Sequence, residues 1–387
     1  MIYISVDNDH HGGLALSLIE KYNFAAEDIT FISHISPRNS TIPASEFCRQ
    51  VIAGHPLSSG SGYRRIVSYI RSISHQRYLK KVFKFSANDI LIVITEYQLN
   101  NALLARKMKQ AGGQVYLFDE GIGFYFNNST FHDLHLRLAD KLFLKLYDLA
   151  FTSLGIPAYA RKGFEGRMYV CIKEKYIDGI YSRMRLPIKR PLKIYGYRNF
   201  LVSAQAQEMK NQGSVILFAS NLRAFGLERE ERVLMEKVVR HLAKNFPQVF
   251  IKIHPSDAVA KNDNFYFYEK LIRALPNISL IDNSITGNEA MERYKPRIVV
   301  GVLGATMFDA FFFGCHPVFL FHLLPRVPEF QICNFVLEGM NYKFIQSFEN
   351  VNPEYKCDVD VASLLYDEEI KAPWEITFRQ SKRPLKN

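Results

Sequence analysis

The stretch NDILIVITEYQLNNALLARKMKQAGGQVYLFDEG, residues 88–121, decides the fold of this chain. Its β-branched run 90–95 predicts a buried strand, and the leucines of 97–111 recur at the spacing of a helix. A pair of glycines ends that helix, and 115–118 predicts the next strand. A strand, a crossover helix and a second strand make a β–α–β unit, which predicts a parallel sheet.

The same alternation continues through the C-terminal half of the chain. Apolar runs that predict strands occupy residues 215–219, 249–253, 278–281, 297–302 and 317–321. Segments that predict helices lie between them, at residues 228–245, 266–274, 289–294 and 305–313. Strands that alternate with helices in this way indicate a doubly wound α/β domain.

The length of 387 residues is too great for one ordinary core and predicts two domains. The proline-containing, basic segment 186–213 is the expected connector. We therefore expect Rossmann-like domains over residues 1–200 and 201–365, followed by a basic tail, 366–387. Segment 33–62, rich in Ser, Pro and Gly, predicts a long loop or lid.

The composition is that of a folded protein, with 48% hydrophobic and 22% charged residues. Five cysteines without a C-x-x-C pair predict reduced thiols, with neither a zinc site nor a disulfide framework. The sequence begins with a strand-like run and no basic-then-apolar leader, so we expect a cytoplasmic protein. No apolar run approaches the roughly 20 residues that span a bilayer, so any membrane contact would be peripheral.

The net charge of +11 is concentrated in two places. Residues 161–198 carry eleven Lys and Arg against three acids, and residues 378–387 carry four basic residues and no acid. Such a surface indicates an anionic partner: nucleic acid, lipid headgroups, or an acidic polymer or sugar nucleotide. The alternative is that this basic surface is a solvated face that only aids solubility. Segment 134–151 places leucines on one helix face, which predicts a core helix or, with its flanking basic residues, a membrane-surface helix.

Two α/β halves whose strands end in polar residues predict the fold class α/β, GT-B: two Rossmann-like doubly wound domains facing a central cleft. The chain lacks a G-x-G-x-x-G fingerprint after a first strand and a G-x-x-x-x-G-K-[ST] motif. A dinucleotide oxidoreductase or a P-loop phosphotransferase would therefore lack its phosphate cradle. Glycosyl transfer is the chemistry that this pattern favours.

The first candidate site is Asp119-Glu120-Gly121, at the end of the strand 115–118. A carboxylate there can take the proton from an acceptor hydroxyl, and glycine lets a sugar approach the backbone closely. The second acid can accept hydrogen bonds that fix the turn. The alternative is an ordinary surface turn, which the aromatic run that follows the motif makes less favoured.

The second candidate site is the end of the strand 249–253, where His254 precedes Pro255. Proline biases His254 toward an extended conformation, so that the imidazole projects into the cleft and can stabilise a leaving phosphate. Lys252 points to the same face of the strand. The alternative for a strand-end histidine is a structural hydrogen bond.

Further polar groups follow other strands of the C-terminal half. Gly304, Ala305 and Thr306 open a helix, whose free amides and hydroxyl can bind phosphate without a metal. The carboxylate of Glu289 can accept hydrogen bonds from ribose hydroxyls. The alternative is a structural role, in which Glu289 stabilises the first turn of a helix. We place Ser220 and Asn221, which follow the first strand of this half, in the same nucleotide-sugar site.

The three motifs, in this order, resemble those of the bacterial sialyltransferases, and most closely the capsule-type polysialyltransferase family. That family is similar to the lipooligosaccharide sialyltransferases in its D/E-D/E-G, H-P and Ser/Thr motifs. The last motif of the family is often a Ser-Ser/Thr pair, and Ala305 stands at its first position here.

The resemblance implies an inverting, metal-independent transfer of sialic acid from CMP-sialic acid, with no cofactor. The resemblance places the catalytic base at Glu120, with Asp119 as the second choice. It also implies that His254 assists the departure of CMP. The N-terminal domain would bind the acceptor and the C-terminal domain the donor. Independently of the resemblance, the position of the positive charge predicts Arg183, Arg185, Lys189 and Arg190 as acceptor-binding residues, together with Gly121 of the acid motif.

We expect an anionic oligosaccharide or glycolipid as acceptor, and a basic tail that contacts the inner face of the bacterial inner membrane. A capsular polysialic acid polymerase and a single-addition α-2,3-sialyltransferase are both open at this point, as is the linkage. A transferase of another nucleotide sugar, such as a Kdo or hexose donor, is a further alternative. A non-catalytic nucleic-acid-binding protein would fit the charge, but the sequence carries no RNA-recognition, helix-turn-helix or zinc signature, and we expect no nucleic acid partner.

Overall fold

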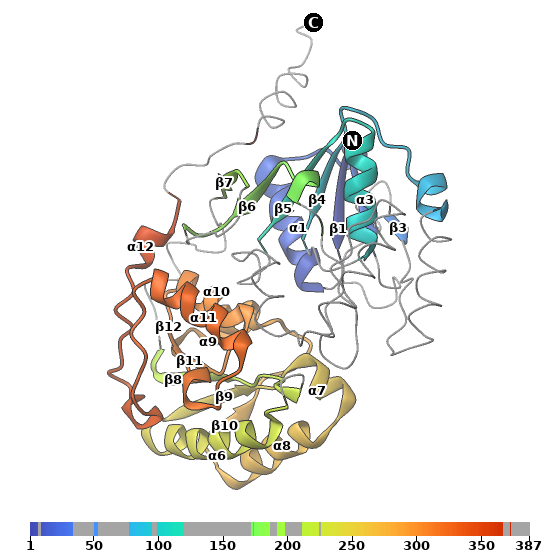
Figure 1. The fold of residues 1–387 in the computed structure, drawn as a ribbon. Coiled ribbons are helices and arrows are strands. Elements are labelled where there is room, and N and C mark those ends of the chain that lie inside the picture. The colour runs from blue at the N-terminus through green and yellow to red at the C-terminus, as the bar shows by residue number, and fades with distance from the viewer. Residues whose placement is uncertain are drawn as a thin grey trace, which may run out of the picture. The chain divides into compact units, whose positions relative to one another are not determined.

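The chain divides into two compact α/β units in a computed structural model (Figure 1). One unit contains residues 1–120, 124–198 and 365–387, and the other contains residues 121–123 and 199–364. The structure describes residues 1–6, 9–33, 50–52, 77–94, 99–119, 172, 174–185, 192–197, 211–223, 226–366 and 372.

The first unit is built on a seven-stranded parallel sheet in the order β3-β2-β1-β4-β5-β6-β7. Its strands are β1 (Ile2–Val6), β2 (Ile29–Ser33), β3 (Gln50–Ile52), β4 (Ile90–Val93), β5 (Gln114–Phe118), β6 (Gly179–Ser182) and β7 (Ile194–Gly196). Helices α1 (Asp9–Tyr22) and α3 (Leu99–Gln110) connect β1 to β2 and β4 to β5. The β–α–β unit predicted for residues 88–121 is therefore confirmed through β5.

Strand β4 shows why this sheet is buried on both faces. Ile90 and Ile92 pack in one apolar cluster with residues of α1, whereas Leu91 and Val93 pack in a second cluster with residues of α3. Successive side chains of a strand point to opposite faces, so a continuous β-branched run fits a strand that is covered on both sides. The order of the strands reverses between β1 and β4, which makes the carboxyl ends there a natural ligand site.

One expectation for this unit is wrong. Segment 33–62 was expected to be a loop or lid, yet β3 (Gln50–Ile52) lies within it and pairs in parallel with β2. A three-residue edge strand is too short to give a clear periodic signal. The predicted helix 134–151 lies outside the described residues.

The second unit is built on a five-stranded parallel sheet in the order β10-β9-β8-β11-β12. Its strands are β8 (Asn211–Phe218), β9 (Gln248–Lys252), β10 (Ile278–Leu280), β11 (Pro296–Gly301) and β12 (His316–Phe319). The helices are α6 (Glu228–Asn245), α7 (Pro255–Ala260), α8 (Asp263–Ala274), α9 (Gly287–Tyr294), α10 (Ala305–Phe312), α11 (Pro328–Gly339) and α12 (Val361–Leu364). Figure 1 shows α6 and α8 together on one face of this sheet, with α9, α10 and α11 on the other.

All five predicted strands of this unit and its four predicted helices are confirmed, and the bounds of α6 match the predicted 228–245. Helices α7, α11 and α12 were not predicted. Helices α7 and α11 each begin with a proline, which is compatible with the first turn because the missing amide hydrogen would have no intrahelical partner there. Among the helices that the structure describes, none has both the length and the apolar composition needed to cross a membrane.

Candidate functional site

The carboxyl ends of the five parallel strands bring the polar residues of the C-terminal unit to one edge of its sheet. Ser220 and Asn221 follow β8, His254 follows β9, Asp282 follows β10 and Gly304 follows β11. Ligands of open α/β sheets bind outside this edge, where the strand order reverses. Here the reversal lies between β8 and β11.

Hydrogen bonds between side chains and backbone join the loops at this edge. Ser220 Oγ donates to the carbonyl oxygen of Leu303 over 3.1 Å and accepts from its amide over 3.4 Å. This hydroxyl therefore joins the loop after β8 to the loop after β11. Ser220 is buried, so this link between the two loops is shielded from water.

His254 caps the N-terminus of α7 with ψ of 134°, the extended value expected before proline. Its Nδ1 accepts from the amide of Ser256 over 3.3 Å and lies 2.8 Å from Ser256 Oγ. Partial burial lowers the pKa of His254 below its usual value, and the negative charge of Asp257 opposes that shift. The imidazole is therefore neutral at neutral pH, whereas the sequence alone allowed it to be a cation.

Lys252 lies at the end of β9 and is buried, which lowers its pKa. The carboxylates of Asp282 and Glu289 oppose that shift. Lys252 Nζ donates to the carbonyl oxygen of Asp282 over 3.4 Å. The ammonium group thus joins the ends of β9 and β10 and brings a positive charge to the edge.

Glu289 is exposed in the first turn of α9, where it forms a capping box with Thr286. The Thr286 amide donates to Glu289 Oε2, and this bond is the largest cause of the lowered pKa of Glu289. Its helix-cap role, the alternative that the sequence left open, is present in the structure. A role toward ribose stays a prediction.

The starts of α9 and α10 pack directly on each other. A Cβ atom on Gly287 would lie 2.4 Å from Thr306 Cγ2, so only glycine fits against that threonine. Asn288 Nδ2 donates to the buried Asp309 over 3.2 Å. Gly304, at the cap of α10, has φ of 149°, which favours glycine. The predicted phosphate loop therefore has a defined conformation, and its ligand stays a prediction.

A buried polar cluster behind His254 was not predicted. Asp257 is 1% exposed and accepts hydrogen bonds from the carboxamides of Asn221, Asn262 and Asn264 over 3.1, 2.7 and 3.4 Å. Asn221 was assigned to the nucleotide sugar, and the structure gives it this intramolecular role as well. The polar residues of this cluster that follow His254 lie on both sides of the apolar stretch 258–260, and their local pattern does not mark them as buried.

Glu231 belongs to the first turn of α6 and is 2% exposed. Its Oε2 accepts from the amide of Leu222 over 3.4 Å, and its buried Oε1 has no hydrogen-bond partner in the described part of the chain. Burial raises the pKa of Glu231 to about 8, and the charge of Asp257 adds to this. Glu231 is therefore a neutral acid at neutral pH, and its position in a run of five charged residues, 228–232, gave no sign of burial.

In the N-terminal unit, Asp119 follows β5 and is 1% exposed. Its Oδ2 accepts from the amide of Arg183 over 3.3 Å, and its Oδ1 lies 3.8 Å from Arg183 Nη2. Arg183 itself is 3% exposed. The first acid of the motif thus forms a buried ion pair between the ends of β5 and β6. Glu120 and Gly121 lie outside the described residues.

The predicted acceptor-binding arginines differ in exposure. Arg183 is buried beside Asp119, whereas Arg185 is exposed and lies 5.4 Å from the ring of Tyr366. Tyr366 also packs on Gly196 of β7, since a Cβ atom there would lie 2.5 Å from its ring. The chain therefore returns to its first unit at Tyr366. Lys189 and Arg190 lie outside the described residues.

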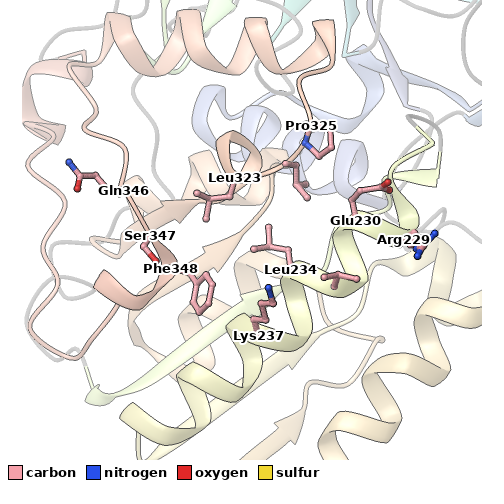
Figure 2. A pocket seen from close by; sticks show the side chains of 11 residues that line it. Arg229, Glu230, Leu234, Lys237, Leu323, Pro325, Gln346, Ser347 and Phe348 are labelled. Atoms are coloured by element: carbon pink, nitrogen blue, oxygen red, sulfur yellow. The ribbon is translucent and has the colours of Figure 1, made fainter.

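A cavity of about 480 Å³ lies elsewhere in the C-terminal unit (Figure 2). Leu234 of α6, Leu323 and Phe348 surround it, with Arg229 and Glu230 at one end. None of the side chains that the sequence assigned to the site lines this cavity. It is separate from the hydrogen-bonded groups at the carboxyl edge.

Comparison with protein families identifies one match. The family model described as Alpha-2,8-polysialyltransferase (POLYST) matches residues 14–320. The matched span includes the acid motif, the His254-Pro255 pair and the loop at Thr306. No curated protein sequence matches the chain.

Solved structures share the fold at low sequence identity. The glycotransferase of kitacinnamycin is 12% identical, covers 91% of this chain and 87% of its own, and has a TM-score of 0.52. A UDP-GlcNAc 2-epimerase from Methanocaldococcus jannaschii, in complex with UDP-GlcNAc and UDP, is 11% identical and covers 98% and 99%, with a TM-score of 0.48. S. aureus MnaA with UDP is 10% identical and covers 85% and 81%, with a TM-score of 0.49. The two Rossmann-like parallel sheets and the likeness to the kitacinnamycin enzyme confirm the GT-B fold class.

Proposed function

The chain belongs to the alpha-2,8-polysialyltransferase family, and we propose that it extends a sialylated glycan by transferring sialic acid from CMP-sialic acid with inversion. The observation that carries this proposal is the family match over residues 14–320, because it spans all three motifs. The GT-B fold supports a nucleotide-sugar transferase. The family description favours an α-2,8 product over a single α-2,3 addition.

We place the donor at the carboxyl edge of the C-terminal sheet. The crevice between β8 and β11 can take the cytidine and phosphate, with the Gly304–Thr306 loop on one side. Lys252 and the Nε2 of His254 supply positive charge and a donor toward the phosphate. Glu289 interacts electrostatically with Lys252, which lies at this edge. Its carboxylate can therefore accept hydrogen bonds from the ribose hydroxyls.

The proposed chemical step is a single displacement at the anomeric carbon. A hydroxyl oxygen of the acceptor attacks that carbon and loses its proton to the carboxylate of Glu120. The bond from the anomeric carbon to the phosphate oxygen of CMP breaks, and its electron pair leaves with CMP. His254 stabilises the charge that develops on that oxygen. Asp119, which directly precedes Glu120 in the sequence, is held by Arg183 in a buried ion pair.

The basic residues give the proposal its anionic partners. A polysialic acid acceptor carries one carboxylate per sugar, and the +8 segment 161–198 offers the opposite charge. The exposed Arg185, with Lys189 and Arg190, would contact that acceptor. The basic end of the chain, 378–387, would lie on the inner leaflet near a lipid-linked acceptor.

The test is transfer from CMP-sialic acid to a fluorescent oligosialic acid, with lactose as the acceptor for single addition. We expect the wild type to produce a ladder of longer oligosialic acids. Glu120→Gln should lower kcat by about 100-fold or more because the base is lost. His254→Ala should lower kcat by about 10- to 100-fold because one phosphate donor is lost.

Two matched variants control this experiment. Glu27→Gln neutralises an exposed acid of the N-terminal unit, and His241→Ala removes an imidazole from the C-terminal half of α6, which leads away from the carboxyl edge. Both should keep wild-type kcat. A single addition to lactose without a ladder would replace the polymerase with a single-addition enzyme. Equal activity of Glu120→Gln, His254→Ala and wild type would remove the site assignment.

A further inference from the structure

We propose that Asn221 and Ser256 are positioning residues that fix the neutral imidazole of His254 as the Nε2–H tautomer. This inference rests on the proposed role of His254 toward the leaving phosphate. It goes beyond that role because it assigns the imidazole a hydrogen-bond donor at one defined atom. It also gives Asn221 a function other than direct contact with the nucleotide sugar.

The orientation of the Asn221 carboxamide is fixed by a backbone donor. Asn221 Oδ1 accepts from the amide of Arg223 over 3.2 Å, and a backbone amide can only donate. Nδ2 must therefore face the other way, toward Ser256 Oγ at 2.7 Å and Asp257 Oδ1 at 3.1 Å. Both of these oxygens can accept, so the geometry is satisfied in one orientation of the carboxamide alone.

The same reasoning fixes the tautomer of His254. The amide of Ser256 points at Nδ1 over 3.3 Å, so Nδ1 must be an acceptor and cannot carry a hydrogen. Ser256 Oγ already accepts from Asn221, and its own hydrogen is free to donate to Nδ1 over 2.8 Å. Two donors therefore converge on Nδ1. In a neutral imidazole the hydrogen must then reside on Nε2.

The chain of groups ends at an anchor that holds it in place. Asp257 is buried and accepts from three carboxamides, so its carboxylate can keep the Asn221 side chain between the loops after β8 and β9. Within the described residues, Nε2 of His254 makes no hydrogen bond, and the side chain is partly exposed. Nε2–H is thus left as the donor for a phosphate oxygen at the carboxyl edge.

The network makes His254 a hydrogen-bond donor in its neutral state. Burial already lowers its pKa, and donors at Nδ1 oppose protonation of that atom. A neutral Nε2–H can stabilise the charge that develops on the departing phosphate without first taking up a proton from water. An imidazole with the hydrogen on Nδ1 would present a lone pair to the phosphate and repel it.

The direct test is nitrogen NMR of the full-length protein labelled with 15N in histidine. Two-bond correlations from the ring carbon hydrogens distinguish the Nε2–H from the Nδ1–H tautomer, and His254→Ala assigns the signal. We expect the wild type to show the Nε2–H pattern at pH 7.5. Ser256→Ala and Asn221→Ala should show a mixture of the two tautomers, and Ser256→Thr, which keeps the hydroxyl, should restore the wild-type pattern.

The kinetic arm uses the same variants with CMP-sialic acid. Ser256→Ala and Asn221→Ala should lower kcat by about 10-fold while KM for CMP-sialic acid stays within about 3-fold, because the donor to the transition state is misaligned. Asn264→Ala is the matched control, since Asn264 also donates to Asp257 and is buried, but it contacts neither Ser256 nor His254. It should keep the tautomer and kcat of the wild type.

Failure of this inference differs from failure of the proposed function. An Nδ1–H pattern in the wild type, or an unchanged pattern and kcat in Ser256→Ala, would overturn the inference while transfer continued. An equal loss in Asn264→Ala would make the network a general support and would also overturn it. If the wild type transferred nothing, the proposed function would fail, and the spectra would still decide whether Asn221 and Ser256 fix the tautomer.

Discussion

Asp119 and Glu231 are both acids buried near the carboxyl edge of a parallel sheet, one in each unit of the chain. Asp119 is paired with a cation, whereas Glu231 is protonated. Asp119 has the guanidinium of Arg183 at 3.8 Å and the Arg183 amide at 3.3 Å. Glu231 accepts from the backbone amide of Leu222 at 3.4 Å and has no cation partner among the described residues, and its pKa is raised to about 8.

The difference shows how each unit accommodates a buried carboxyl group. A buried charge is tolerated where an opposite charge and hydrogen bonds replace water, and otherwise the group takes up a proton. The N-terminal unit uses the first solution, next to the proposed base. The C-terminal unit keeps Glu231 protonated, and near His254 it surrounds the buried carboxylate of Asp257 with three neutral carboxamide donors.

The largest effect is expected for Arg183→Met. This change leaves Asp119 buried without its guanidinium, which should lower the free energy of unfolding by about 3–5 kcal/mol. Urea unfolding of the full chain measures the loss. Adding Asp119→Asn to Arg183→Met should recover much of it, because the uncompensated charge is removed.

The exposed Arg185 supplies the control for that prediction. Arg185→Met should change the free energy of unfolding by less than about 1 kcal/mol, since an exposed cation near a ring contributes little. Its expected effect is on the acceptor instead, with weaker binding of oligosialic acid and unchanged binding of CMP. If Arg183→Met and Arg185→Met destabilised the protein equally, the contrast between buried and exposed arginines would be wrong.

The next effect is a gain in stability for Glu231→Gln that depends on pH. The usual pKa of a glutamate side chain is 4.5, and the pKa of Glu231 in the folded state is about 8. Between these two pH values the folded state holds a proton that the unfolded state releases. The stability of the wild type therefore falls as pH rises through this window. The carboxamide of the variant does not titrate, so its stability lacks this dependence. Glu231→Gln should match the wild type at pH 4.5 and exceed it at pH 7 by up to about 3 kcal/mol.

Thermal unfolding at pH 4.5, 6 and 7 measures this gain. The adjacent, exposed Glu230 provides the control, because Glu230→Gln should show no such gain with pH. A wild type and Glu231→Gln of equal stability at pH 7 would mean that Glu231 is ionised in the folded state, and the contrast with Asp119 would disappear.

The smallest effect is expected for Ser220→Ala, which removes the hydroxyl between the loops after β8 and β11. The loss of a buried hydrogen bond should cost about 1 kcal/mol of unfolding free energy. Ser284→Ala, in the exposed loop after β10, should cost less. Weaker CMP binding by Ser220→Ala at unchanged stability would instead assign the hydroxyl to the nucleotide.

The fold could be predicted from the sequence because its strands are strongly marked. In β4, Ile90 and Leu91 are both buried on opposite faces, so the run is apolar without interruption, and glycines end α3. In α6 the apolar stripe is long enough to define both ends. The edge strand β3 and the short helix α7 were missed because three and six residues are too few to show a period.

The site could be predicted as a set of positions, but the partners of those positions could not. His254, Lys252 and Ser220 were placed at strand ends by the pattern of apolar runs. The hydrogen bonds of Asn221 to Ser256 and Asp257 cross 35 and 36 residues of sequence. Likewise, no local pattern separates the buried Arg183 from the exposed Arg185 two residues later.

The amino-acid sequence by itself determined the α/β architecture, the order of the motifs and the family resemblance, because each depends on residues that are near one another in the chain. The tertiary structure decided which charges are paired, which acid is protonated and which nitrogen of His254 carries the hydrogen. Those properties depend on burial and on the direction of hydrogen bonds, and both are fixed only when distant loops meet at one edge of a sheet.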